Sequence, residues 1–137
     1  MPLVRNREES PDVTRKPITS DNLPSPAGPF SLAIRGENLM FVSGQVAQDP
    51  ATGALIDGDV ASQTEQVLRN LAAVLEAAGK DLGDVLRVGV YLTDMAAFAM
   101  MNQVYAAHFG APYPARTAIE VARLPLGAAV EIDAIVG

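Results

Sequence analysis

One apolar stripe in the middle of the chain constrains the fold more than any other feature. Between Asp59 and Gly79, apolar residues recur at i, i+1, i+4, i+7, i+8 and i+11, on one face of a helix: Val67, Leu68, Leu71, Val74, Leu75 and Ala78. Asp59 is a suitable N-cap, and Gly79 suits a left-handed residue after the last turn. The sequence therefore predicts a helix whose buried face packs against a second layer.

Segments that favour strands flank this helix. Residues 31–35 and 39–43 are short apolar runs on either side of Gly36-Glu37-Asn38, which predicts a hairpin. Residues 85–93 are rich in β-branched side chains and predict a buried strand. Asp94 is a candidate cap for a second helix, which cannot continue through Pro112.

Two segments of alternating character end the chain. They cover residues 115–122 and 129–136 and are joined through Leu124-Pro125. If they pair as a hairpin that turns near Pro125, Glu131 lies opposite about Glu120. Glu131 would then lie four residues along the ladder from Arg116, about 13 Å at ~3.3 Å per residue.

The element order is thus β-β-α-β-α-β-β, with room for one more short strand early in the chain. We expect a single α+β domain with a five- to six-stranded mixed sheet and two helices on one face. Two helices leave the other face uncovered, so we expect the chain to assemble with further copies of itself. Residues 1–22 are polar and without periodicity, and we interpret them as a mobile arm before a domain over residues 23–137.

Composition limits the chemistry. The 137 residues include no Cys and one His, which excludes disulfides, thiolate nucleophiles and any mechanism that needs two histidines of one chain. Residues 17–137 hold six basic and thirteen acidic groups, a net charge of -7. The basic residues are scattered, so we expect no nucleic-acid partner. The longest apolar run, residues 95–101, is too short to span a bilayer, and we expect a cytoplasmic protein.

Arg116 and Glu131 are the strongest candidates for chemistry. A guanidinium at the start of a strand suits bidentate capture of a carboxylate, and small Ala118 leaves room beside it. Glu131 stands between Val130 and Ile132, where apolar neighbours raise the pKa of a carboxyl group. Spacing alone favours simpler interpretations, a surface arginine paired with an acid and a solvent-facing glutamate.

Other candidates carry weaker signals. Ser43 lacks the first glycine of a nucleophile elbow, but Ser43 and Gly44 can offer a hydroxyl and a backbone N–H at a strand end. His108 is more easily interpreted as a packed or surface residue than as a base. Phe98 and Tyr105 stand at helical spacing, which is more typical of core residues than of ligand contacts.

At several positions the sequence resembles the RidA family, also called YjgF-type reactive intermediate deaminases. The similar segments run from about Leu23 to the C-terminus and include Gly28-Pro29-Phe30-Ser31, Phe41-Val42-Ser43-Gly44-Gln45, Asn102-x-x-Tyr105, Pro114-Ala115-Arg116-Thr117 and Val130-Glu131-Ile132. The resemblance implies a homotrimer with the sheets inward and ligand clefts between subunits. It also implies hydrolysis of enamines and imines, such as 2-aminoacrylate and 2-iminopropanoate, to 2-oxo acids and ammonia without a cofactor.

The resemblance also implies roles for individual residues. Arg116 would bind the substrate carboxylate, and Glu131 would activate water and transfer protons. The cleft would be lined by Phe30, Ser43, Gly44, Asn102 and the backbone N–H of Ala118. Many family members have Tyr in place of Phe30 and Cys in place of Ala118, which leaves the substrate preference open. A non-catalytic carboxylate-binding trimer and a ribonuclease remain the alternatives, although one His and the acidic charge argue against RNA cleavage.

Overall fold

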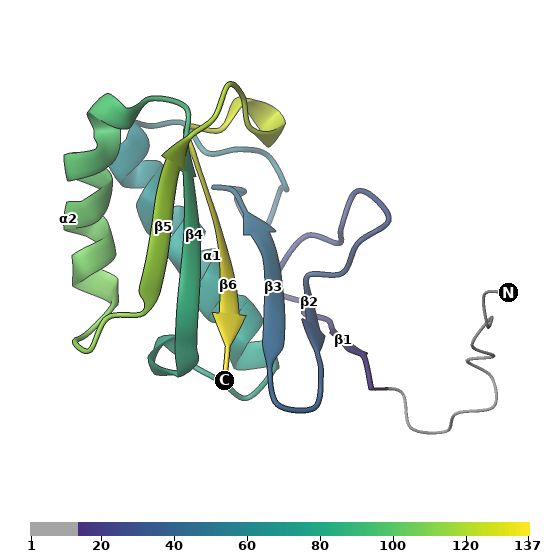
Figure 1. Ribbon diagram of the computed structural model, residues 1–137. Coiled ribbons are helices and arrows are strands. Elements are labelled where there is room, and N and C mark those ends of the chain that lie inside the picture. The colour runs from purple at the N-terminus through teal and green to yellow at the C-terminus, as the bar shows by residue number, and fades with distance from the viewer. Residues whose placement is uncertain (1–13) are drawn as a thin grey trace, which may run out of the picture.

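The computed structural model describes residues 14–137, in which six strands form one mixed sheet (Figure 1). The order across the sheet is β1-β2-β3-β6-β4-β5. The strands are β1 (Lys16–Ile18), β2 (Ala33–Arg35), β3 (Met40–Gln45), β4 (Val85–Leu92), β5 (Ala115–Glu120) and β6 (Val130–Val136). The C-terminal strand β6 therefore lies inside the sheet, between β3 and β4.

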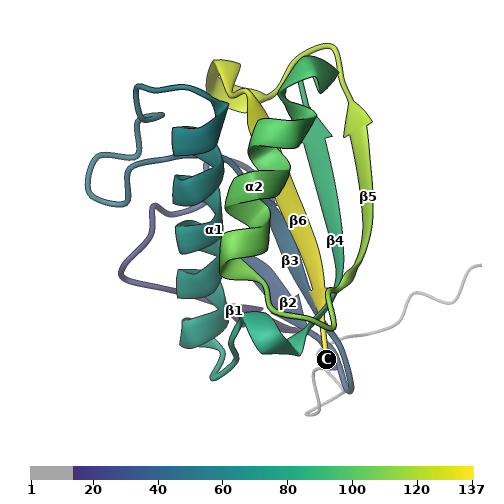
Figure 2. The same cartoon turned by 90° about the vertical axis from the view of Figure 1, so that its left-hand side faces the viewer.

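Both long helices pack on the same face of the sheet, as Figure 2 shows. They are α1 (Val60–Ala77) and α2 (Phe98–His108). The Asp59 side chain accepts a hydrogen bond from the Ser62 N–H, and Gly79 adopts a φ of 72° just after α1. Single turns of 3-10 helix, η2 (Leu82–Asp84), η3 (Met95–Ala97) and η4 (Pro125–Gly127), complete the connections. The expected α+β fold is confirmed.

The core lies between the helices and the covered face of the sheet. The apolar stripe of α1 is fully buried against alternate residues of the central strands, with Val67, Leu68, Leu71, Val74, Leu75, Val88, Val90, Val130 and Ile132 all at 0% exposure. Alternation along β6 then turns Glu131, Asp133 and Ile135 to the opposite, open face. Phe41 and Ile119 also lie on that face and are 48% and 44% exposed.

The last two strands do not form the hairpin considered from the sequence. β5 pairs in parallel with β4, and β6 pairs antiparallel with the other edge of β4. Glu131 is therefore opposite Tyr91 instead of Glu120. The cause is α2, which joins β4 to β5 as a crossover connection and so makes them parallel neighbours.

The N-terminal boundary also differs from the expectation. Lys16–Ile18, placed within a mobile arm by the sequence, forms β1 and pairs antiparallel with β2. The rest of the expected arm, residues 1–13, lies outside the described residues. In the part of the chain that is described, no helix has the length and hydropathy needed to cross a membrane.

Candidate active site

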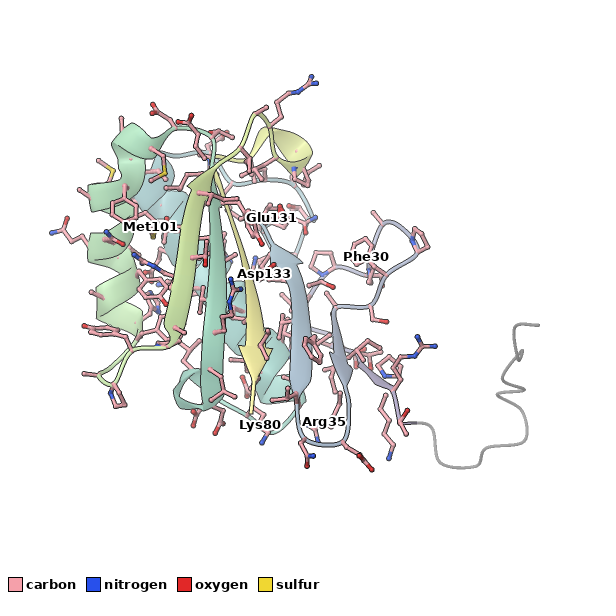
Figure 3. The ribbon with its side chains drawn as sticks, in the orientation of Figure 1. Phe30, Arg35, Lys80, Met101, Glu131 and Asp133 are labelled. Atoms are coloured by element: carbon pink, nitrogen blue, oxygen red, sulfur yellow. The ribbon has the colours of Figure 1, made fainter. Side chains whose placement is uncertain are left out.

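Glu131 lies on the open face of the sheet, on the central strand β6 (Figure 3). On the β3 side, the register shifts between Val42 and Gln45, so that Ser43 and Gly44 form a bulge there. A Cβ atom at Gly44 would overlap the Glu131 carboxylate. The absence of a side chain at Gly44 is thus what lets this carboxylate lie over the backbone of β3.

The environment of Glu131 favours its protonated form. Burial raises the pKa of Glu131, and the negative charge of Asp133, two residues further on the same face, raises that pKa as well. Asp133 accepts a hydrogen bond of 3.0 Å from the Tyr91 hydroxyl. A carboxyl group with a raised pKa is suited to exchange protons with a substrate near neutral pH.

Arg116 lies on the other face of the sheet. In β5 it pairs with Val88, whose side chain is fully buried on the helix-covered side. The Arg116 guanidinium carbon lies 4.7 Å from the centre of the Tyr105 ring and 5.5 Å from the centre of the Phe98 ring, both on α2. These distances are typical of cation–π contacts, so the two rings hold the guanidinium at the edge between β5 and α2.

Asn102 belongs to the same group as Arg116. It lies four residues after Phe98 and three before Tyr105, on the helix face that carries both rings. Asn102 Oδ1 and the Tyr105 hydroxyl are buried and have no hydrogen-bond partner among residues 14–137. Ala118 is two residues beyond Arg116 in β5 and packs against the core. Unpaired buried polar atoms beside a cation are the features of a site that a polar ligand completes.

One chain does not bring Arg116 and Glu131 together. Their strands are separated by β4, about 10 Å across the sheet, and Arg116 is level with Ala134, about 10 Å along it from Glu131. More important, the two side chains lie on opposite faces. The predicted site residues therefore form two groups, one around Glu131 with Ser43 and Gly44, the other around Arg116 with Asn102 and Ala118.

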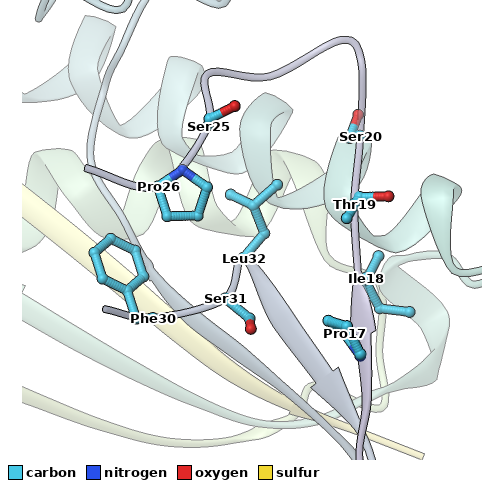
Figure 4. A pocket seen from close by; sticks show the side chains of 9 residues that line it. All are labelled: Pro17, Ile18, Thr19, Ser20, Ser25, Pro26, Phe30, Ser31 and Leu32. Atoms are coloured by element: carbon cyan, nitrogen blue, oxygen red, sulfur yellow. The ribbon is translucent and has the colours of Figure 1, made fainter. Parts of the chain in front are cut away.

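Phe30 lies on the β2 side of the sheet, and its side chain is 54% exposed. The segment after it runs beside the bulge, because the Ser43 hydroxyl donates to the Ser31 carbonyl at 2.6 Å and the Ser43 N–H to the Leu32 carbonyl at 2.9 Å. Phe30 borders a hollow of about 230 Å³ (Figure 4), lined by Pro17, Ile18, Thr19, Ser20, Ser25, Pro26, Phe30, Ser31 and Leu32. This hollow is mostly apolar and does not include Glu131 or Arg116.

Sequence reasoning missed three residues of these groups. Tyr91 and Asp133 lie beside Glu131, and Tyr105 was interpreted as core although its ring also holds Arg116. The position of Asp133 two residues after Glu131 on an alternating strand was the one available signal. His108 is elsewhere, with Nε2 2.5 Å from Glu65 of α1. Within residues 14–137, no three His, Cys, Asp or Glu side chains form a group that would hold a metal ion.

Comparisons with known proteins show which family and which relatives the chain is similar to. Residues 20–137 match the family model described as Endoribonuclease L-PSP. A RutC family protein of Pyrococcus horikoshii is 52% identical over 118 residues, 86% of this chain and 94% of that protein. A mouse protein named 2-iminobutanoate/2-iminopropanoate deaminase is 41% identical over 90% of this chain and 91% of its own. The crystal structure of RidA from an Antarctic Psychrobacter species superposes with a TM-score of 0.85 at 43% identity, covering 89% of this chain and 98% of that one.

The chain belongs to the RidA family. This confirms the resemblance drawn from the sequence motifs. The RidA match begins at residue 20 and includes both groups of candidate residues.

Proposed function

We propose that this protein is a hydrolytic deaminase that converts reactive enamines and imines of amino acids to 2-oxo acids and ammonia. The names and high coverage of the deaminase relatives support this activity. The observation that carries it is the half-buried Glu131 on Gly44, a carboxyl group with a raised pKa placed against backbone without a side chain. Such a group can deliver and accept protons at a small substrate.

We further propose that the working site is formed between two copies of the chain. Arg116 and Glu131 lie on opposite faces and too far apart to contact one small substrate within one subunit. The open face exposes the large apolar side chains of Phe41 and Ile119, which need a cover, and a closed ring of copies would supply it. A homotrimer with the sheets inward, in which Arg116 of one subunit approaches Glu131 of the next, meets both requirements.

Each residue of this proposed site has a separate role in the reaction. Arg116 binds the substrate carboxylate with two parallel N–H donors, and the aromatic rings beside it limit its motion. Asn102 Oδ1, which lacks a partner, accepts a hydrogen bond from the substrate nitrogen. An enamine first takes a proton on its β-carbon from the protonated Glu131 carboxyl group and becomes the iminium ion, whose carbon is electrophilic without further activation.

Glu131 accepts and donates the protons that are transferred during hydrolysis. Its carboxylate takes a proton from water as the water oxygen forms a bond to the imine carbon, and the C=N π electrons move to nitrogen. Glu131 then returns the proton to that nitrogen, and its carboxylate takes the hydroxyl proton as the C–N bond breaks, so that ammonia leaves as the C=O bond forms. Placement of the water and transfer of the proton account for the expected rate enhancement, of order 10² or more.

The test is release of pyruvate from enzymatically generated 2-aminoacrylate. We expect the protein to accelerate this release, and Arg116→Ala and Glu131→Gln each to lower kcat/KM by about 10²-fold. Arg123→Ala, which removes an exposed arginine outside both groups, serves as the control and should leave the rate unchanged. A wild-type rate equal to buffer would leave a carboxylate-binding trimer as the better interpretation.

RNA cleavage is the second candidate, because the matching family model is described as an endoribonuclease. The site gives it little support. The sole histidine, His108, contacts Glu65 on the helix side of the sheet, remote from Glu131 on the open face. Cleavage of a labelled RNA that persists through repurification and disappears in Glu131→Gln would favour this activity over deamination. The cytoplasmic location expected from the sequence stays a prediction.

A further inference from the structure

A hydrogen-bonded pair that no step of the proposed mechanism uses lies next to Glu131. The Tyr91 hydroxyl of β4 donates to Asp133 Oδ2 of β6 at 3.0 Å. Tyr91 is also the residue directly opposite Glu131 in the β4–β6 register. The same tyrosine therefore borders one carboxylate and binds the next one along the strand.

A second glycine makes room for this pair. Gly89 is opposite Asp133 in β4, and a Cβ atom there would overlap Asp133 Oδ1 and lie 2.9 Å from the Tyr91 hydroxyl. Gly44 leaves the same kind of space for Glu131 on the β3 side. The two neighbours of β6 thus each have a glycine under one of its two open-face carboxylates.

Within one chain, few other charged groups face Glu131. β3 has no titratable side chain, and β4 brings Tyr91 and Arg87 to the open face. Arg87 Nη2 donates to Thr117 Oγ1 of β5 at 3.0 Å, on the side away from β6. Asp133 is therefore the nearest charge to Glu131 on the strands that surround it, and no cation among the described residues is bonded to either acid.

We propose that Asp133, held in place by the Tyr91 hydroxyl, is a positioning residue for Glu131 that keeps it a strong proton acceptor. This inference rests on the proposed deaminase function and adds a residue pair to it. Two carboxylates on alternate positions of one strand repel each other, and the repulsion is relieved when one of them takes a proton. The Tyr91 hydroxyl donates to Asp133 and not to Glu131, so Glu131 is the acid that takes the proton.

The pH profile of the deaminase tests this role. Asp133→Asn keeps an oxygen that accepts from Tyr91 but removes the charge, so the acid limb of the kcat/KM profile should move to lower pH. Asp133→Glu restores the charge and should return the limb toward its original place. Asp57→Asn removes an equal charge from an exposed loop and should leave the profile unmoved. A limb that stays in place in Asp133→Asn would overturn the proposal, because a merely structural role lowers activity at every pH.

A direct titration separates this inference from the proposed function. The ¹³C signal of the Glu131 side-chain carboxyl, assigned by its loss in Glu131→Gln, reports its protonation without any substrate. Its midpoint should move to lower pH in Asp133→Asn even if the protein hydrolyses no imine. Tyr91→Phe keeps the charge but releases Asp133, and we expect kcat to fall about tenfold with KM little changed. An unshifted Glu131 midpoint in Asp133→Asn, or full kcat in Tyr91→Phe, would contradict the proposal.

Discussion

At the scale of single residues, the raised pKa that suits Glu131 for its proposed catalytic role also costs stability. Burial and the charge of Asp133 raise the pKa of Glu131, so this carboxyl group binds a proton more tightly in the folded chain than in the unfolded chain. The contribution of protonated Glu131 to stability is therefore fully present below the pKa that this group has in the unfolded chain. It is lost as the pH rises through the pKa that Glu131 has in the folded chain. Glu131→Gln removes this loss, and we expect the variant to be more stable than the original protein at pH 8 but not at pH 4.

Thermal unfolding at the two pH values checks this expectation. Glu76→Gln is the matched control, because Glu76 is an exposed glutamate of α1. The gain at pH 8 should accompany the loss of activity, a trade-off common at sites that hold a group in an unfavourable environment. Equal unfolding temperatures for Glu131→Gln and the original protein at pH 8 would show that Glu131 carries no such cost.

Gly44 is the residue whose substitution tests the space under Glu131. A methyl group in Gly44→Ala overlaps the Glu131 carboxylate and must displace it. We expect kcat for imine hydrolysis to fall tenfold or more, since about 1 Å of misplacement can cost 10²-fold. Gly110→Ala is the control, because no atom lies within 4 Å of a Cβ placed there. Activity retained in Gly44→Ala would mean that Glu131 does not need this position.

At the scale of elements, a hydrogen bond between His108 and Glu65 joins the two helices that cover the sheet. His108 at the end of α2 contacts Glu65 of α1, and Arg69 donates to the same carboxylate at 3.0 Å. The hydrogen bond from His108 lowers the pKa of Glu65. This contribution to stability is present above the unfolded pKa of Glu65 and is lost as pH falls through its folded pKa.

Glu65→Gln should therefore destabilise the protein at pH 7. The Glu65 side chain is 39% exposed, so solvent screens the pair and we expect only about 0.5–1 kcal/mol. Urea unfolding at pH 7 and at pH 3 measures the difference, which should vanish at the lower pH. Because α2 also carries the rings that hold Arg116, the KM for an imine substrate should rise slightly as well. An equal loss of stability at both pH values would assign the effect to packing instead of charge.

The sequence predicted most of these elements but not how the last two strands pair. The stripe from Val67 to Ala78 and the cap at Asp59 located α1, because helical period and capping are local properties. The position of β6 between β3 and β4 is decided by contacts far apart in sequence, and a short link at Leu124-Pro125 suggested a hairpin instead. The Glu131–Glu120 register failed for that reason, and alternation within β5 and β6 could not show that Arg116 and Glu131 lie on opposite faces of the sheet.

At the scale of the whole molecule, one chain presents two incomplete sites. Arg116, with the unpaired Asn102 beside it, has a cation and no base, while Glu131 on the open face has a base and no cation. Sequence motifs pointed to a guanidinium and a carboxylate as chemical partners, but they carry no information on which subunit supplies each. Only the three-dimensional register shows that the two groups belong to opposite faces of the sheet.

A mixing experiment decides whether the two halves meet between subunits. Arg116→Ala and Glu131→Gln chains are each expected to be nearly inactive alone, whether the site lies within or between chains. In trimers refolded from an equal mixture, a site between subunits has an intact Arg116 from one chain and an intact Glu131 from its neighbour in about one quarter of cases. Imine hydrolysis should then recover to about a quarter of the original rate.

The control for this experiment mixes each variant with itself under the same refolding conditions. A site contained in one chain always carries one of the two substitutions, so mixing would restore nothing. A second control mixes the original chain with a double variant that carries both Arg116→Ala and Glu131→Gln. In this mixture a site between subunits is intact only where two original chains adjoin, so the mixture measures dilution without complementation. Recovery in the first mixture would show that each subunit places its helix-side Arg116 against the open face of the next subunit, as the proposed assembly requires.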